Sequence, residues 1–408
     1  MRVLFTTPIL EHPAAGGPQL RIENSIKALV KVCELDIIYR DLGYSDSERR
    51  EETSAFFRNY AGEYHLISRP EPKGVGPAAK LSSVLERGMN RLFDTRTQVH
   101  ARYILDHVER RGIDVVWFGY GNISFPLIKL IKAAKPSLKV VCDTDSVWSR
   151  FVLRELPYVT GLRKWRVWRD GKRKEAEERA WVNLCEMTTA VSEVDAEYYR
   201  SVAFNPERVR VFSNVIDVES YVSHPQPPAG FRTPSIYLAG SFGHYNSPMD
   251  TAARWMLEEV FPRVLATHPH VHFYIVGRNS ELGFGHIKND NVTVTGRLES
   301  VLPYLCNTDI ALVPLMFESG TRFKILEAGA CRVPIVSTTL GAEGIPVQNG
   351  QHILIADEPE MFAAAIIRLL DDKELAKKLT INCHDLVSRD FSVDALANEA
   401  RGILEYLS

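Results

Sequence analysis

One stretch of the sequence, which we call the deciding segment, indicates the fold most clearly: Pro314–Gly344, PLMFESGTRFKILEAGACRVPIVSTTLGAEG. It begins at the end of an apolar run (310–314), enters a helical pattern at 321–331, and then meets a second apolar run at 333–337. A strand, a helix and a second strand in this order form a βαβ unit, whose two strands run parallel in one sheet. The segment therefore predicts an α/β protein with a parallel sheet.

The same alternation continues on both sides of this segment. Further apolar runs typical of buried strands occur at 3–8, 34–39, 65–68, 114–118, 139–142, 187–191, 209–212, 235–239, 271–276, 291–295 and 352–355. A stretch rich in proline and glycine at 221–234 interrupts the pattern and reads as a linker. We therefore predict a doubly wound N-terminal domain at 1–220, a second at 235–390, and a terminal helix at 391–408 that is a candidate for packing back on the first domain.

Composition places the chain among soluble globular enzymes. Hydrophobic residues make up 45% and charged residues 25% of 408 residues, which excludes a disordered chain, a fibre and a coiled coil. The net charge of -2 gives no whole-molecule case for nucleic-acid binding. No apolar run approaches the ~20 residues that span a bilayer, and Val3–Leu10 is too short for a signal peptide. Six scattered cysteines without a C-x-x-C pair argue against a zinc or disulfide framework and favour the cytoplasm.

The helix start in the deciding segment has the features of an anion site. Gly320 lets the backbone approach a ligand, Thr321 is a candidate N-cap, and the free N–H groups that follow suit a phosphate. Arg322 and Lys324 lie in the first turn, where cations are disfavoured unless an anion neutralises them. Lys324 and Glu327 share one helix face, so they can reach a phosphate and a sugar hydroxyl together. A solvated Lys–Glu pair on an ordinary helix is the alternative.

The ten residues from Glu327 to Val336, EAGACRVPIV, resemble the E-A-x-A-C-G-x-P-V-V signature of the group 4 glycosyltransferases, a large retaining family. The stretches SGTRFKILEA at 319–328 and GAEG at 341–344 resemble one subset of that family. The resemblance implies the GT-B fold, in which two Rossmann-like, doubly wound parallel-sheet domains face a central cleft. It also implies a nucleotide-sugar donor on the C-terminal domain, an acceptor on the N-terminal domain, and a ribose held by Glu327.

The chain departs from the family pattern just before this helix. Another glutamate of the family belongs at the position of Ser319, whereas Glu318 lies one place earlier. Glu318 after a local shift, or backbone N–H groups near Ser319, are the alternatives for contacting the donor sugar. The first loop of the C-terminal domain also lacks the basic residues that many members use for the diphosphate. Arg322 and Lys324 are therefore the candidates for supplying that charge.

Three more loops of the C-terminal half resemble donor-binding loops of the family. Each follows a predicted strand, and together they add Gly240, Ser241, Gly277, Arg278, Gly296 and Arg297 to the candidate donor-binding residues. The alternative for Arg278 and Arg297 is that they are exposed loop cations.

The N-terminal half contributes two candidate loops. Gly16 and Gly17, with Arg21 shortly after them, follow the first strand and resemble the family's G-G loop at the diphosphate and acceptor. Asp145 ends a strand at the position where family members often have a histidine near the reacting sugar. Its carboxylate is expected to bind a sugar or acceptor hydroxyl, or else to cap the next helix. The D-T-D triplet at 143–145 lies away from the donor site and is discounted as a metal site.

The segment Arg150–Lys174 is strongly basic. It contains nine lysines and arginines, with Trp148, Trp165 and Trp168 flanking or interleaved. One interpretation is a solvated helix with two core tryptophans. The other is a surface for anionic membrane or an anionic acceptor, because basic residues near anionic lipid contribute about 1 kcal/mol each and tryptophan favours the interface. No nucleic-acid-binding motif is present, so nucleic acid is not an expected partner.

These features and the family resemblance predict a glycosyltransferase that moves a sugar from a UDP-, GDP- or dTDP-sugar to a hydroxyl of a glycan, polysaccharide, lipid-linked or protein acceptor. The resemblance implies that configuration is retained. The candidate catalytic residues are Arg322, Lys324 and Asp145. Cationic side chains and a helix N-terminus are expected to take the place of a metal, and no cofactor is expected. One alternative is a nucleotide-sugar 2-epimerase of the same fold. The other is a non-catalytic sugar-nucleotide-binding or scaffold protein. The expected location is the cytoplasm, with peripheral attachment to the inner face of the membrane left open.

Overall fold

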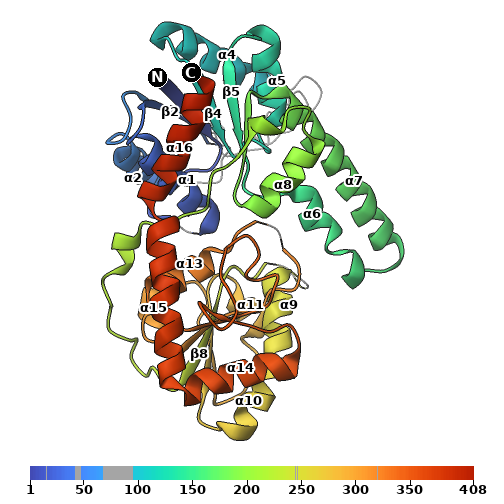
Figure 1. The fold of residues 1–408 in the computed structure, drawn as a ribbon, viewed down its shortest axis with the longest axis vertical. Helices are drawn as coiled ribbons and strands as arrows, with labels where there is room; N and C mark the ends of the chain where they lie inside the picture. The colour runs from blue at the N-terminus through green and yellow to red at the C-terminus, as the bar shows by residue number, and fades with distance from the viewer. Residues whose placement is uncertain (15, 42–46, 68–94, 244, 246, 319) are drawn as a thin grey trace, which may run out of the picture. The chain divides into compact units, whose positions relative to one another are not determined.

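The computed structural model describes all residues except 15, 42–46, 68–94, 244, 246 and 319 (Figure 1). The contacts within the chain divide it into two compact units. Unit 1 consists of Met1–Asp145, Arg173–Ser213 and Leu396–Ser408, and unit 2 consists of Ser146–Lys172 and Asn214–Ala395. The chain therefore passes between the units more often than a simple two-domain layout with one linker predicts.

Unit 1 is built on a parallel sheet with the strand order β3-β2-β1-β4-β5-β6-β7 in the described part of the chain. In the register, Phe5 pairs with Ile37 on one side and with Trp117 on the other. Nearly every residue of the central strands is buried, which is typical of a parallel sheet covered on both faces. The strands are β1 (Arg2–Thr7), β2 (Glu34–Arg40), β3 (Tyr64–Ile67), β4 (Val115–Gly119), β5 (Lys139–Asp143), β6 (Met187–Ala190) and β7 (Val209–Val211).

The helices that join these strands lie between them in the chain, as the alternating pattern predicts. They are α1 (Gly17–Leu29), α2 (Ser47–Phe57), α4 (Thr95–Arg111), α5 (Phe125–Ala134), the second half of α7 (Gly161–Leu184) and α8 (Glu193–Val202). The last helix, α16 (Val393–Leu407), belongs to unit 1 from Leu396 onward. Lys139 on β5 donates a hydrogen bond to the carbonyl of Leu407, so both chain ends lie in unit 1 (Figure 1).

Unit 2 has a second parallel sheet, with the order β10-β9-β8-β11-β12-β13 among its described residues. Its strands are β8 (Ser235–Ala239), β9 (His272–Val276), β10 (Val292–Val294), β11 (Ile310–Val313), β12 (Ile335–Ser337) and β13 (Leu354–Ile355). Its helices are α6 (Trp148–Leu153), the first half of α7, α9 (Pro248–Trp255), α10 (Phe261–Thr267), α11 (Ser280–Phe284), α12 (Leu302–Leu305), α13 (Phe323–Ala330), α14 (Pro359–Asp371) and α15 (Lys373–Asp390).

The predicted doubly wound architecture is confirmed. In each sheet the strand order reverses beside the first strand, between β1 and β4 in unit 1 and between β8 and β11 in unit 2. Ligands of such sheets bind outside the carboxyl ends of the strands at this reversal. The deciding segment begins directly after β11 and forms α13 and β12, so α13 starts beside the reversal in unit 2. In the described part of the chain, no helix combines the length and apolar character needed to cross a membrane.

Candidate functional site

The loop between β11 and α13 brings the candidate anion site to the carboxyl end of the unit 2 sheet. Gly320 has a φ of 82°, in the left-handed region that favours glycine. The helix begins at Phe323 with Arg322 as its N-cap, so the prediction that Thr321 is the N-cap is wrong. The buried Thr321 hydroxyl accepts a hydrogen bond from Asn214 Nδ2 at 2.7 Å instead. Arg322 is buried as well, and its Nη1 donates to the carbonyl of Gly320.

Lys324 and Glu327 line one small cavity at the start of α13. The cavity has a volume of about 20 Å³, and its other walls come from α12, β8 and β11 through Leu305, Tyr237, Ala239, Ala311, Leu312 and Val313. Burial lowers the pKa of Lys324, while the charges of Glu318 and Glu327 oppose this shift. Burial raises the pKa of Glu327, against the effects of a hydrogen bond from Tyr221 and the charge of Lys324. The structure thus brings the predicted cation and carboxylate together beside the strand reversal.

Tyr221 is a partner of Glu327 that sequence reasoning missed. It ends a short 3-10 helix, Val218–Tyr221, at the edge of the predicted linker, and its side chain is buried. Its hydroxyl donates to Glu327 Oε1 at 3.1 Å. Burial raises the pKa of Tyr221 above the ordinary range, so the hydroxyl stays protonated and acts as a donor. The two residues are 106 positions apart, and no local pattern links them.

The three predicted glycine loops meet at neighbouring strand ends of unit 2. Gly240 follows β8, Gly277 follows β9, and Gly296 follows β10. The amide of Gly277 donates to the carbonyl of Gly296 at 3.1 Å. With its φ of 124°, Gly277 lies so close to Gly240 that a Cβ would come within 2.1 Å of the Gly240 carbonyl oxygen. Only glycine fits at position 277, and the close contact keeps these loops at one edge of the sheet.

The remaining candidates around these loops are more exposed. Arg278 donates from Nε to Ser241 Oγ at 3.2 Å, and both Arg278 and Arg297 are exposed. Their interpretation as loop cations is therefore compatible with the structure. Glu318 is half-buried, and its charge acts on Lys324. Ser319 lies outside the described residues.

A basic residue outside the deciding segment holds this loop in place. Arg154 directly follows α6, and its Nη1 donates to the carbonyl of Glu318 at 2.6 Å. Both of its terminal nitrogens also donate to the carboxylate of Glu343, at 2.7 and 2.8 Å, in a bidentate pair. The ring of Tyr158 packs against Phe317, with centroids 5.2 Å apart. Arg154 is one of the cations of the basic segment Arg150–Lys174. Its contacts lie within unit 2, so it does not contribute to an exposed basic surface.

In unit 1, the predicted glycine loop lies at the start of α1. Gly16 is the N-cap of this helix and is exposed, while Gly17 opens it. Arg21 lies inside unit 1, with 2% of its surface exposed. Its Nη2 forms an ion pair with Asp143 and donates to the carbonyl of Thr144 at 3.0 Å. The charge of Arg21 is therefore compensated by contacts inside unit 1. That Arg21 also contacts a ligand stays a prediction.

Asp145 lies just beyond β5, at the carboxyl edge of the unit 1 sheet. It is half-buried, and its Oδ1 accepts a hydrogen bond from Asn122 Nδ2 at 2.7 Å. Tyr120, which follows β4, has a φ of 56°, an unusual value for a residue other than glycine. Burial, and then the charge of Asp145, raise the pKa of Tyr120. Asp145 therefore lies close to Asn122 and Tyr120 at the carboxyl edge of the sheet, where ligands of such sheets bind.

Comparison with known proteins finds a family match for part of unit 2. Residues 234–372 match a family model described as glycosyl transferases group 1. Over 165 residues the chain is 28% identical to the gpi3 subunit of phosphatidylinositol N-acetylglucosaminyltransferase from Schizosaccharomyces pombe, covering 38% of this chain and 34% of that subunit. The chain thus matches little more than a third of the length of its curated relatives.

Solved structures resemble the chain over nearly its full length. Sucrose-phosphate synthase from Thermosynechococcus elongatus has a TM-score of 0.68 at 16% identity, covering 100% of this chain and 99% of that one. HepE from Anabaena, solved in complex with UDP-glucose, has a TM-score of 0.62 at 12% identity, with coverage of 100% and 99%. At these identities the likeness shows the fold. The chain therefore has the GT-B fold that its sequence predicts, and the part that contains the candidate donor residues matches the glycosyl transferases group 1.

Proposed function

We propose that the protein is a glycosyltransferase that transfers a sugar from a nucleotide-diphosphate sugar to an acceptor hydroxyl with retention of configuration. The observation that carries the proposal is the pairing of Lys324 and Glu327 at the start of α13, beside the strand reversal, within the segment that matches the family model. A cation and a carboxylate on one helix face suit the diphosphate and the ribose of one nucleotide. HepE, a structural neighbour, has been solved with UDP-glucose, which supports a donor of this class.

The proposed chemistry uses the charge that develops on the leaving group. As the bond from the sugar to the diphosphate breaks, negative charge grows on the diphosphate oxygens. Lys324, Arg322 and the N-terminus of α13 would stabilise that charge without a metal ion. Glu327 would accept hydrogen bonds from the ribose hydroxyls, with the carboxylate oriented by the Tyr221 hydroxyl. Asp145, held by Asn122, would bind a hydroxyl of the acceptor or of the transferred sugar.

A panel of UDP-, GDP- and dTDP-sugars tests the proposal. We expect slow release of nucleoside diphosphate from one of them in the absence of acceptor, because water can take the acceptor's place. An epimerised nucleotide sugar would instead indicate a 2-epimerase of the same fold. Binding without any turnover would indicate a sugar-nucleotide-binding or scaffold protein.

The exposed face of α7 supports a further part of the proposal, which concerns the acceptor. Trp165 and Trp168 are 54% and 49% exposed, so the interpretation of these tryptophans as core residues is wrong. Leu162 is 78% exposed on the same half of the helix. The exposed cations Arg163, Lys164, Arg166 and Arg169 accompany these side chains. We propose that this helix docks on anionic membrane at its cytoplasmic face, where a lipid-linked acceptor would be found.

A further inference from the structure

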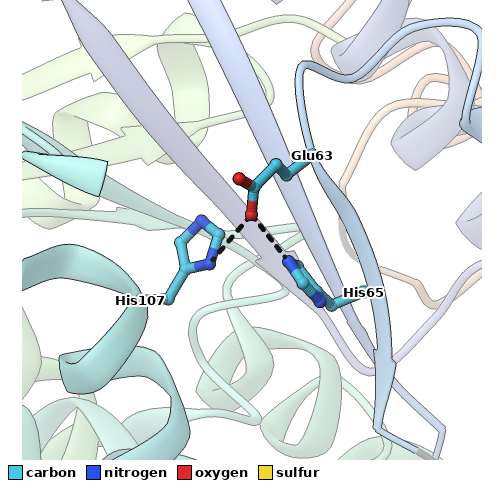
Figure 2. Close-up of side chains that lie close together, drawn as sticks. All are labelled: Glu63, His65 and His107. Carbon is cyan, nitrogen blue, oxygen red and sulfur yellow. Dashed lines mark hydrogen bonds and ion pairs between the residues drawn. The ribbon is translucent and has the colours of Figure 1, made fainter. Parts of the chain in front are cut away.

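Unit 1 contains a cluster of metal-ligand side chains that the proposed transferase chemistry does not use. Glu63, just before β3, and His65, on β3, face His107 from α4 (Figure 2). Glu63 Oε2 lies 3.0 Å from His65 Nε2 and 3.9 Å from His107 Nδ1, and the three atoms lie within 4.8 Å of one another. A tetrahedral zinc ion separates its nitrogen and oxygen ligands by about 3.4 Å. We propose that Glu63, His65 and His107 bind a zinc ion.

Each of the three side chains also contacts a partner residue, through an atom other than the one proposed to bind zinc. His107 Nε2 lies 3.0 Å from Asp36 Oδ2, and both side chains are 1% exposed. Because the carboxylate accepts the Nε2 proton, Nδ1 is left with a lone pair that faces Glu63. A carboxylate behind a histidine in this way is the usual outer support of a zinc ligand.

The other two ligands are supported in the same manner. His65 Nδ1 lies 2.9 Å from the Tyr103 hydroxyl, which can accept its proton and leave Nε2 for the metal. Glu63 Oε1 lies 3.3 Å from Arg111 Nε, so its Oε2 is the atom that faces the histidines. Two imidazoles and one carboxylate form a three-ligand set that zinc accepts with a fourth position open to water.

Arg110 contacts two of the atoms that are proposed to bind zinc, so it would compete with the ion. Its guanidinium lies 3.0 Å from Glu63 Oε2 and 3.0 Å from His107 Nδ1, where it supplies positive charge in the absence of metal. The Arg110 side chain is 55% exposed, so it can leave to solvent when an ion enters. Zinc binding therefore has to displace Arg110, and removal of this side chain should strengthen binding.

Within unit 1, the site lies at a different end of the strands from the candidate loops around Gly16 and Asp145. Glu63 and His65 lie at the amino end of β3, the edge strand of the sheet, and His107 lies near the end of α4. The candidate loops around Gly16 and Asp145 follow the carboxyl ends of β1 and β5. An ion in this position would link α4 to the edge strand β3. The zinc proposal does not depend on transferase activity.

Zinc titration of the full chain by calorimetry after chelator treatment tests the proposal, with Co²⁺ absorption as a second readout of four-coordinate binding. His65→Ala should weaken zinc binding by more than about 100-fold, because loss of a ligand exceeds the 10–100-fold cost of an altered supporting partner. Arg110→Ala should tighten it by roughly 10–150-fold, which is the worth of the charge-assisted bonds that the ion must displace. His268→Ala, at a partly exposed histidine of unit 2, is the matched control and should bind like wild type.

Three outcomes would overturn the proposal. One is zinc binding by His65→Ala equal to that of wild type, and another is no tighter binding by Arg110→Ala. The third is the absence of binding in both wild type and Arg110→Ala. Circular dichroism of each variant separates these outcomes from misfolding, and the half-exposed positions of His65 and Arg110 make misfolding less of a concern than substitution of the buried His107.

Discussion

At the residue scale, Glu327 is the side chain on which the proposed donor site most depends. Its carboxylate lines the cavity at the start of α13 and accepts a hydrogen bond from the Tyr221 hydroxyl. Glu327→Ala should weaken nucleoside diphosphate binding by roughly 10–150-fold, because hydrogen bonds to a charged group contribute about 1.5–3 kcal/mol. Calorimetry measures the change. If the Glu327→Ala protein is folded and binds nucleotide like wild type, the ribose does not bind to Glu327.

Tyr221 tests whether the orientation of that carboxylate matters. Tyr221→Phe removes only the hydroxyl that donates to Glu327 Oε1 and keeps the buried ring. We expect weaker nucleotide binding than in wild type, by a smaller factor than for Glu327→Ala, because the carboxylate remains but is free to rotate. Combined with Glu327→Ala, the Tyr221→Phe change should have no further effect on affinity. Additive losses would show that Tyr221 acts independently of Glu327.

Asp145 is the candidate for a role near the reacting sugar. Asp145→Asn keeps the shape of the side chain and removes its charge, so it should lower turnover far more than donor affinity. The rate of diphosphate release beside calorimetry of the same variant separates the two quantities. Unchanged turnover in a folded protein would leave Asp145 as a structural partner of Asn122.

Spacing along one helix was sufficient to predict which residues of the deciding segment lie together. Lys324 and Glu327 are three positions apart, and the helical period alone places them on one face. Tyr221 and Arg154 were not predictable in this way, because they reach the segment across 106 and 189 positions of sequence. The prediction of a Thr321 N-cap was wrong because α13 begins at Phe323, one residue later than this cap requires, and the Thr321 hydroxyl accepts a hydrogen bond from the distant Asn214.

At the scale of elements, the end of α6 supports the loop before α13. Arg154 joins the carbonyl of Glu318 to the carboxylate of Glu343, and its side chain is 26% exposed. Arg154→Lys keeps the charge but cannot form the bidentate pair, so the loop should become less ordered and nucleotide affinity should fall. A double-mutant cycle of Arg154→Ala with Glu343→Ala should give a coupling of about 0.5–3 kcal/mol in nucleotide affinity. A coupling of zero would show that the pair does not affect the site.

The exposed half of α7 predicts membrane docking. Replacement of Arg163, Lys164, Arg166 and Arg169 with glutamate should abolish sedimentation with anionic vesicles, because each cation near anionic lipid contributes about 1 kcal/mol. The matched control replaces the exposed Lys288, Lys373, Lys377 and Lys378 of unit 2 with glutamate, and it should sediment like wild type. If wild type does not sediment even at low salt, the membrane part of the proposal is wrong.

At the scale of the whole molecule, the alternation of strands and helices predicted both sheets, because each βαβ unit is a local pattern that repeats along the chain. The composition of the two units was harder to predict. Ser146–Lys172 belongs to unit 2, although it directly follows Asp145 of unit 1 in sequence. Such membership depends on which surface a helix packs against, and the pattern of the helix itself does not specify that surface.

The most direct test of the central claim compares binding and turnover in variants of the two cations at the start of α13. Because leaving-group charge grows toward the transition state, Lys324→Ala and Arg322→Ala should lower the rate of diphosphate release more than they lower nucleotide affinity. The measurement is steady-state release from the active nucleotide sugar, beside calorimetry with the matching nucleoside diphosphate. We expect the loss of kcat to be larger than the loss of affinity in both variants. Wild-type turnover and binding in both of these variants and in Glu327→Ala would contradict it and place the donor site elsewhere.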